Sequence, residues 1–194
     1  MDSYKLAVKF PFEGLSRVKA EDFTPVFHRW IQGKALPGHQ LIDVAPYEHV
    51  KDGPGVVLVS HEANIHADET GGKPGLLYRR KHPFGESFRD RLKVTWGAAL
   101  KAAALLEQEA SLAGQAKIRT DEASFLIFDR LLAPNTPETF SAVRNELESF
   151  LKTLYGVPSV ELTYQQKPEE GFEVGIKTGK SIPVATLLDR VATM

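Results

Sequence analysis

Short runs of alternating apolar and polar residues, separated by turn residues, occur in both halves of the chain. The first, Tyr4–Phe12, is rich in aromatic and β-branched residues and is predicted to be a strand that ends near Pro11. Turn signals at 52–55 (DGPG) and 69–75 (ETGGKPG) indicate short connections, so neighbouring strands are expected to be mostly antiparallel. Further strands are predicted at 40–46, 55–68, 76–82, 123–132, 159–165 and 171–179.

Other segments repeat their apolar residues with helical spacing. The longest helix is predicted over 86–113, where Phe88, Leu92, Trp96, Leu100 and Ala103 form one stripe. Three more helices are predicted. They cover 24–33, with Asp22 or Thr24 as N-cap and Pro25 in the first turn, 137–155, with Thr136 as N-cap and Gly156 after the last turn, and 182–194.

The order of these elements predicts an α+β fold, with helices packed on one face of a mostly antiparallel or mixed sheet. A chain of 194 residues is expected to form a single domain. Strand, helix, several strands and helix follow one another twice, which is consistent with two similar halves, 1–115 and 116–194. No repeat of individual residues supports this division.

Composition narrows the class of protein. The chain is 42% hydrophobic and 25% charged, with a formal net charge of -1, which is ordinary for a soluble globular protein and does not favour nucleic acid or an anionic membrane. The absence of cysteine excludes disulfides, thiol nucleophiles and iron–sulfur clusters. No signal peptide or membrane-spanning run is recognised, so a cytoplasmic location is expected.

Two stretches resemble known motifs and fail on spacing. His61, Glu62 and His66 resemble the zinc-protease pattern H-E-x-x-H, but the histidines are five positions apart and follow an apolar stretch typical of a strand. The segment 175–181 (GIKTGKS) has three residues where a phosphate-binding loop needs four. We therefore predict no metal and no cofactor.

One group of polar residues remains as a candidate site. If 60–68 is extended, Glu62, Asn64 and His66 share one face. A symmetrical hairpin over 69–75 places His66 opposite Tyr78, Asn64 opposite Arg80 and Glu62 opposite His82. We predict that these six side chains bind a polar or anionic small molecule: Glu62, Asn64, His66, Tyr78, Arg80 and His82.

This prediction depends on the register. A slip of one residue would present Leu77, Arg79 and Lys81 on that face instead. A solvent-facing sheet with cross-strand charge pairs would have a similar sequence pattern.

Two functions stay open. The first is a small-molecule-binding or assembly protein without catalysis, which is expected to form a homodimer through an apolar helix or sheet face. The second is an enzyme that uses His66 with Glu62 or His82 as an acid–base pair, with or without a divalent metal.

Four segments together resemble a bacterial family of conserved proteins of unknown function. They are PVFHRWIQG, LIDVAPYEHVKDGPGVVLVSHEAN, GLLYRRK and RLLAPNTPETF. The resemblance implies a bacterial cytoplasmic protein and transfers no activity, cofactor or site residue.

Overall fold

The computed structural model describes residues 1–13, 19–47, 49–51, 53–112, 114–164 and 171–194. Along this part of the chain the elements are β1 (Leu6–Pro11), α1 (Ala20–Gly33), β2 (Leu41–Pro46), β3 (Val56–Ser60), β4 (Ala63–Asp68), the 3₁₀ turn η1 (Thr70–Gly72), β5 (Gly75–Arg80), α2 (Phe88–Glu107), the 3₁₀ turn η2 (Ala110–Leu112), β6 (Glu122–Ile127), α3 (Pro137–Tyr155), β7 (Glu161–Tyr164), β8 (Phe172–Lys177) and α4 (Val184–Thr193). The predicted α+β class is confirmed.

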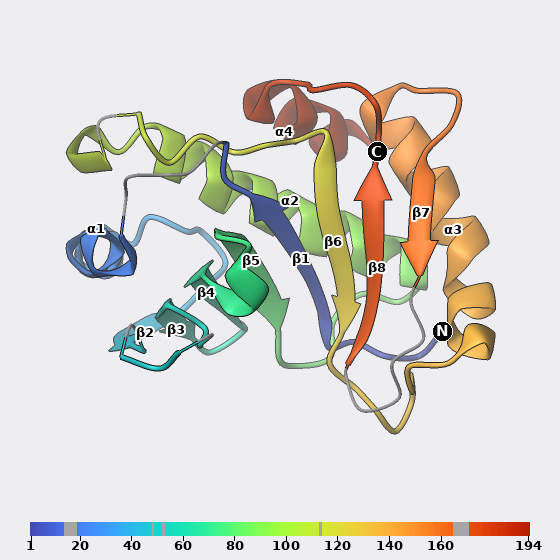
Figure 1. The fold of residues 1–194 in the computed structure, drawn as a ribbon, viewed down its shortest axis with the longest axis horizontal. Coiled ribbons are helices and arrows are strands. Elements are labelled where there is room, and N and C mark those ends of the chain that lie inside the picture. The colour runs from blue at the N-terminus through green and yellow to red at the C-terminus, as the bar shows by residue number, and fades with distance from the viewer. Residues whose placement is uncertain (14–18, 48, 52, 113, 165–170) are drawn as a thin grey trace.

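The eight strands of the described residues form one sheet in the order β2-β3-β4-β5-β1-β6-β8-β7, and every neighbouring pair is antiparallel. β1 and β6 pair inside the sheet, with four strands beyond β1 and two beyond β6 (Figure 1). On one side β1 pairs with β5, the strand before α2, and on the other β6 pairs with β8, the strand before α4. The halves 1–115 and 116–194 thus meet at the β1–β6 pair, and their origin by duplication stays a prediction.

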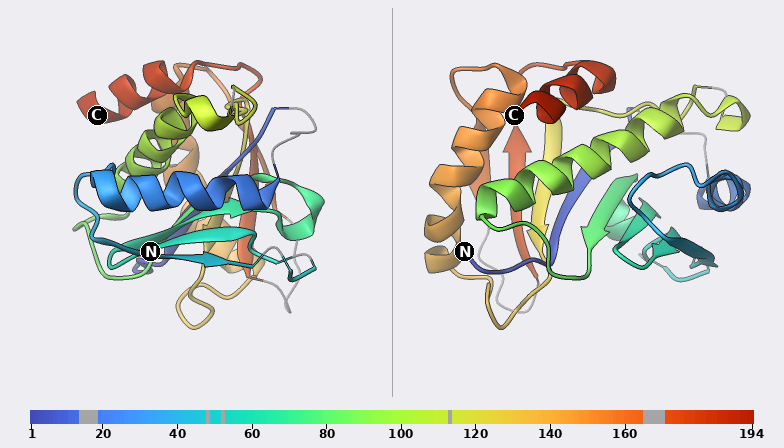
Figure 2. Two further views of the ribbon diagram at one scale, coloured as in Figure 1. Left: turned by 90° about the vertical axis from the view of Figure 1, so that its left-hand side faces the viewer. Right: turned by 180° about the vertical axis from the view of Figure 1, so that it is seen from behind.

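Helices cover one face of this sheet, as the view from behind shows (Figure 2). α2 packs across β1 and β5 and against α3 and α4, while α1 packs on β2, β3 and β4. The predicted apolar stripe of α2 is buried, and the Trp96 ring lies 5.7 Å from that of Phe125 and 5.3 Å from that of Phe150. Aromatic packing between helix and sheet therefore forms the centre of the core. Among the described residues, no helix has the length and apolar character to cross a membrane.

The helix ends agree with the sequence in α3 and differ in α1. In α3, the Thr136 hydroxyl accepts a hydrogen bond from the Thr139 N–H, and Gly156 ends the helix with a φ of 63°. α1 begins at Ala20, earlier than predicted, because the Asp22 carboxylate accepts a hydrogen bond from the Lys19 N–H at 2.9 Å and stabilises an additional first turn.

The prediction of one strand over 55–68 is wrong, because the chain reverses direction between Ser60 and Ala63. β3 and β4 are the two arms of this hairpin and pair antiparallel. The Ser60 hydroxyl donates to the Ala63 carbonyl at 2.7 Å and accepts from the Ala63 N–H at 3.0 Å. A side chain thus makes the hydrogen bonds that close the turn, which contains none of the usual glycine, proline or asparagine signals.

Gly55 brings the segment before β3 into contact with β4. Its φ is +64°, and a Cβ atom there would lie 1.9 Å from the Ala67 carbonyl oxygen. We expect Gly55→Ala to lower the free energy of unfolding by about 3 kcal/mol, through the left-handed backbone and the clash with β4. Chemical denaturation measures this loss.

Gly33→Ala is the matched control, because a Cβ at Gly33 would meet nothing within 4 Å. That variant should unfold close to the wild-type midpoint. Equal midpoints for the two variants would contradict the predicted close approach at Gly55.

Candidate functional site

The pairing of β4 with β5 differs by one residue from the predicted register. His66 lies opposite Leu77 and not Tyr78, and Asn64 lies opposite Arg79 and not Arg80. Burial explains the difference, because Leu76 and Tyr78 are both 0% exposed beneath the helices. The predicted register would have turned Tyr78 towards the face without helices, at the cost of that burial.

The six predicted residues therefore separate into two groups. Asn64 and His66 share the face of the sheet without helices, named here the open face, as the sequence predicted for these two. Tyr78 and Arg80 belong to the opposite, helix-covered face. Glu62 and His82 lie outside the strands, near the ends of β4 and β5. The predicted single surface is not formed.

This separation removes the proposed acid–base pairs of His66. Glu62 precedes His66 by four positions, roughly 13 Å along an extended chain. Its carboxylate accepts a hydrogen bond from the Gln40 N–H at 2.8 Å. His82 stacks on His61, with ring centroids 4.8 Å apart, at the same end of the hairpin as Glu62. Neither residue is within hydrogen-bond distance of His66.

His66 itself is enclosed on the open face. Its side chain lies between Val57 and Leu77 on the neighbouring strands, and the residue is 6% exposed. Both ring nitrogens are buried, and the Pro54 backbone acts on the ring only as a weak hydrogen-bond partner. Burial lowers the pKa of His66 to about 4, against the opposing effect of the Asp68 carboxylate. The imidazole is therefore neutral at physiological pH.

A buried ion pair lies beside His66. The Lys9 ammonium contacts the Asp68 carboxylate, and both side chains are largely covered. The Thr70 hydroxyl donates a second hydrogen bond to Asp68 at 2.8 Å. These contacts attach the β4–β5 connection to the central strand β1, in agreement with the requirement that buried charges be paired.

The register places a continuous row of side chains across the open face. From β3 to β7 the directly opposed residues are Val57, His66, Leu77, Lys9, Ser124, Gly175 and Thr163. Large residues occupy the β4–β5 end of the row, and small residues occupy the β6–β8 end. The surface is consequently filled near His66 and hollow over Ser124 and Gly175.

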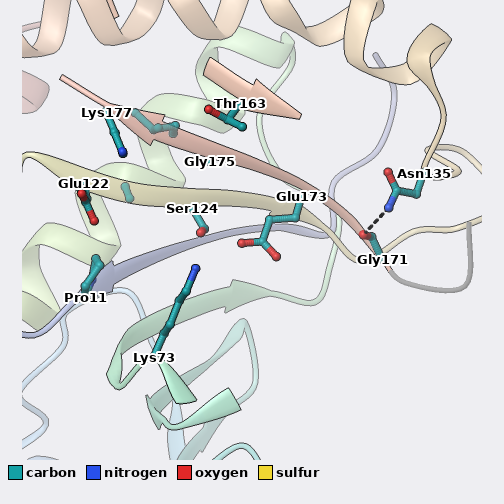
Figure 3. A pocket seen from close by; sticks show the side chains of 12 residues that line it. Pro11, Lys73, Glu122, Ser124, Asn135, Thr163, Gly171, Glu173, Gly175 and Lys177 are labelled. Carbon is teal, nitrogen blue, oxygen red and sulfur yellow. Dashed lines mark hydrogen bonds between the residues drawn. The ribbon is translucent and has the colours of Figure 1, made fainter. Parts of the chain in front are cut away.

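The hollow is a cavity of about 380 Å³ between β6, β8 and the β4–β5 connection. Lys73 extends from that connection towards Ser124 and Glu173 (Figure 3). Glu122 and Lys177 lie directly opposite each other on β6 and β8, at the other end of the cavity. Charges of both signs therefore line a cavity with a small-residue floor.

The charges in this cavity are largely uncompensated by protein partners. Glu122 forms a salt bridge with Arg119 at 3.1 Å. Within the described part of the chain, Lys73, Glu173 and Lys177 form no salt bridge. They remain able to contact a bound molecule through ammonium and carboxylate groups.

On the covered face, Tyr78 and Arg80 join a histidine that the sequence did not single out. His39 Nε2 lies 2.8 Å from the Tyr78 hydroxyl, and Arg80 Nη1 donates to the same hydroxyl at 3.4 Å. Burial lowers the pKa of His39 and raises that of Tyr78. Both groups are thus kept neutral, and the phenol oxygen contacts the imidazole on one side and accepts a hydrogen bond from the guanidinium on the other.

Sequence reasoning missed His39 and most of the cavity residues for different reasons. Ser124, Glu173 and Lys177 follow the period of two along β6 and β8, so their common face could have been recognised. His39 lies in the connection between α1 and β2, and only the folded chain brings it to Tyr78. In the ranges that the structure describes, no three histidine, aspartate or glutamate side chains are grouped as a metal site requires.

No protein-family model and no curated protein matches the chain. The resemblance to a bacterial family of unknown function therefore stays a prediction. The assignment of a function rests on the geometry of the open face.

The buried His66 makes stability depend on pH. Its pKa falls from 6.5 in the unfolded chain to about 4 in the folded protein, so the unfolded state binds the proton more readily as the pH drops. The contribution of the neutral His66 to the free energy of unfolding is present above about pH 6.5 and is lost as the pH falls towards 4. The contribution lost between about pH 7.5 and pH 5 is about 2 kcal/mol.

Urea denaturation across this pH range measures the effect. His66→Gln should show a shallower pH dependence than the wild type, whereas His28→Gln, at an exposed position on α1, should keep the wild-type slope. Identical slopes for wild type and His66→Gln would refute the enclosed, neutral histidine.

Proposed function

We propose that the protein binds a small polar molecule on the open face, in the cavity over Ser124 and Gly175. The observation that carries the proposal is a hollow of about 380 Å³ with ammonium and carboxylate groups that lack salt-bridge partners in the described chain. This volume lies within the range of small-molecule sites. The role is binding without catalysis, and the wider polar face includes His66.

The charges favour a molecule that carries both a cationic and an anionic group. Glu173 provides a carboxylate for a cationic group, while Lys73 and Lys177 provide ammonium groups for a carboxylate or phosphate. Alternate residues on one side of a strand are about 7 Å apart, so Glu173, Gly175 and Lys177 present charge, space and opposite charge along β8. A short peptide, whose two charged ends are separated by several residues, has this arrangement of charges.

Catalysis through His66 with Glu62 or His82 is not proposed, because the hairpin separates these side chains. Assembly as a homodimer stays a prediction from the apolar content of the helices. The open face is a poor candidate for such an apolar interface, since its exposed part over β6 and β8 is polar and charged.

The binding proposal is tested by filling the cavity. Ser124 is on the open face, and Ser124→Phe places a ring over the floor without entering the helix-covered core. Pools of free amino acids and short peptides are titrated into ¹⁵N-labelled protein, and amide shifts are followed by NMR. We expect a saturable response on β6 and β8, weakened at least about tenfold in Ser124→Phe.

Ser141→Phe is the matched control, because Ser141 is exposed on α3, away from the cavity. It should bind like the wild type. A response that is unchanged in Ser124→Phe, or the absence of any response on β6 and β8, would overturn the proposal.

A further inference from the structure

The covered face of the sheet carries a second group of polar side chains, which the proposed function does not use. α1 and α2 stand apart on this face, and the connection from α1 to β2 crosses between them (Figures 1 and 2). His39 on that connection contacts the Tyr78 hydroxyl, which also accepts from Arg80 on β5. Arg80 and Lys101 of α2 are close enough for their charges to act on His39. Three elements distant in sequence therefore contribute to one polar group.

The Arg80 guanidinium is the unusual member of this group. A guanidinium has five N–H donors, and among the described residues Arg80 makes a single long hydrogen bond, of 3.4 Å, to the Tyr78 hydroxyl. Its Nε is buried without a hydrogen-bond partner, and no carboxylate of the described residues lies within salt-bridge distance of it. A partly buried cation without an anionic partner is energetically costly, so the presence of arginine at this position requires an explanation.

The need to hold the connection between α1 and β2 in place does not explain the unpaired Arg80 guanidinium. The Tyr78–His39 contact attaches the connection to β5, and the Glu62 carboxylate holds the Gln40 N–H at 2.8 Å. The His61 N–H donates to the Gln40 carbonyl as well. The connection is thus fixed by groups other than Arg80.

The surroundings of Arg80 orient the guanidinium and add positive charge. The Phe84 ring covers one face of the guanidinium, with the Cζ atom 4.2 Å from the ring centroid. Glu62, whose charge acts on His39 and Tyr78, directs its carboxylate at the backbone of Gln40. Lys101 forms no salt bridge within the described residues. Within the described residues, neither Arg80 nor Lys101 thus has a salt-bridge partner.

We propose that this group, named here the Arg80 site, binds an oxyanion, the phosphate or carboxylate group of a small molecule. Arg80 supplies the planar donor fork that matches two oxyanion oxygens, and Lys101 supplies a second positive charge. The Tyr78 hydroxyl, which contacts His39, accepts the Arg80 hydrogen bond and so orients the guanidinium. The site is on the opposite face from the cavity over Ser124 and is independent of it.

Neighbouring arginines on opposite faces provide the test. Arg79 and Arg80 are adjacent, but the Arg79 guanidinium lies over the Phe128 ring, 3.9 Å from its centroid, on the open face. Inorganic phosphate is titrated into the protein against chloride of equal ionic strength, and the Arg80 Nε–H and His39 ring resonances are followed by NMR. We expect a saturable shift with phosphate that is absent with chloride.

Arg80→Gln should weaken phosphate binding about tenfold or more, because it removes the fork and the charge. Arg79→Gln and Ser124→Phe should leave it unchanged. Arg80→Lys keeps the charge without the fork and should bind with intermediate strength, so the proposal stays testable if Arg80→Gln does not fold. Equal shifts with chloride, or a loss of binding in Arg79→Gln as large as in Arg80→Gln, would overturn it.

Discussion

The burial of Leu76 and Tyr78 beneath the helices is the constraint on which both faces of the sheet depend. Side chains alternate along a strand, so the burial of these two residues sends Leu77 and Arg79 to the open face. It also fixes the pairing of β5 with β4 on one side and β1 on the other. His66 and Lys9 then flank Leu77. The row of opposed side chains across the open face, which ends at the cavity, follows from this register of β5.

The buried Lys9–Asp68 pair divides the open face into two environments. Towards β3, His66 lies between apolar neighbours and its ring nitrogens are shielded from water. Towards β8, the residues become small and the surface is hollowed. Burial of an ion pair is costly unless its hydrogen bonds are completed, and Thr70 completes those of Asp68. The same pair attaches the β4–β5 connection to β1, and Lys73 extends from this connection over the cavity.

The helices and the class of the fold could be predicted from the sequence, because they depend on local patterns. The stripe from Phe88 to Ala103 and the Thr136 cap of α3 are both signals within a few residues, and both are confirmed. The hairpin at 60–63 could not be predicted in this way, since its closure depends on the hydroxyl of Ser60 and the turn contains no glycine, proline or asparagine. That missed turn made one strand out of β3 and β4.

The candidate site was only partly predictable, for a related reason. A period of two identifies Asn64 and His66 as neighbours on one face whatever strand lies beside them, and the structure confirms this. The residues of β5 that lie beside them depend on the register of β4 with β5. The predicted and the observed registers differ by one residue, and the sequence pattern is compatible with both. Burial of Tyr78 decides between them, and that burial depends on α2, which follows later in the chain.

The one-residue difference in register changes what the polar residues can do. In the predicted pairing, Arg80 would have shared the open face with His66, which is enclosed and neutral. In the observed pairing, Arg80 lies on the helix-covered face with Tyr78, His39 and Lys101, while the charges of the open face gather over β6 and β8. Because β5 presents consecutive residues to opposite faces, a ligand of one face cannot contact the residues of the other. The two candidate sites therefore differ in chemistry as well as in position: mixed charges in an open hollow on one face, and an arginine held for an anion on the other.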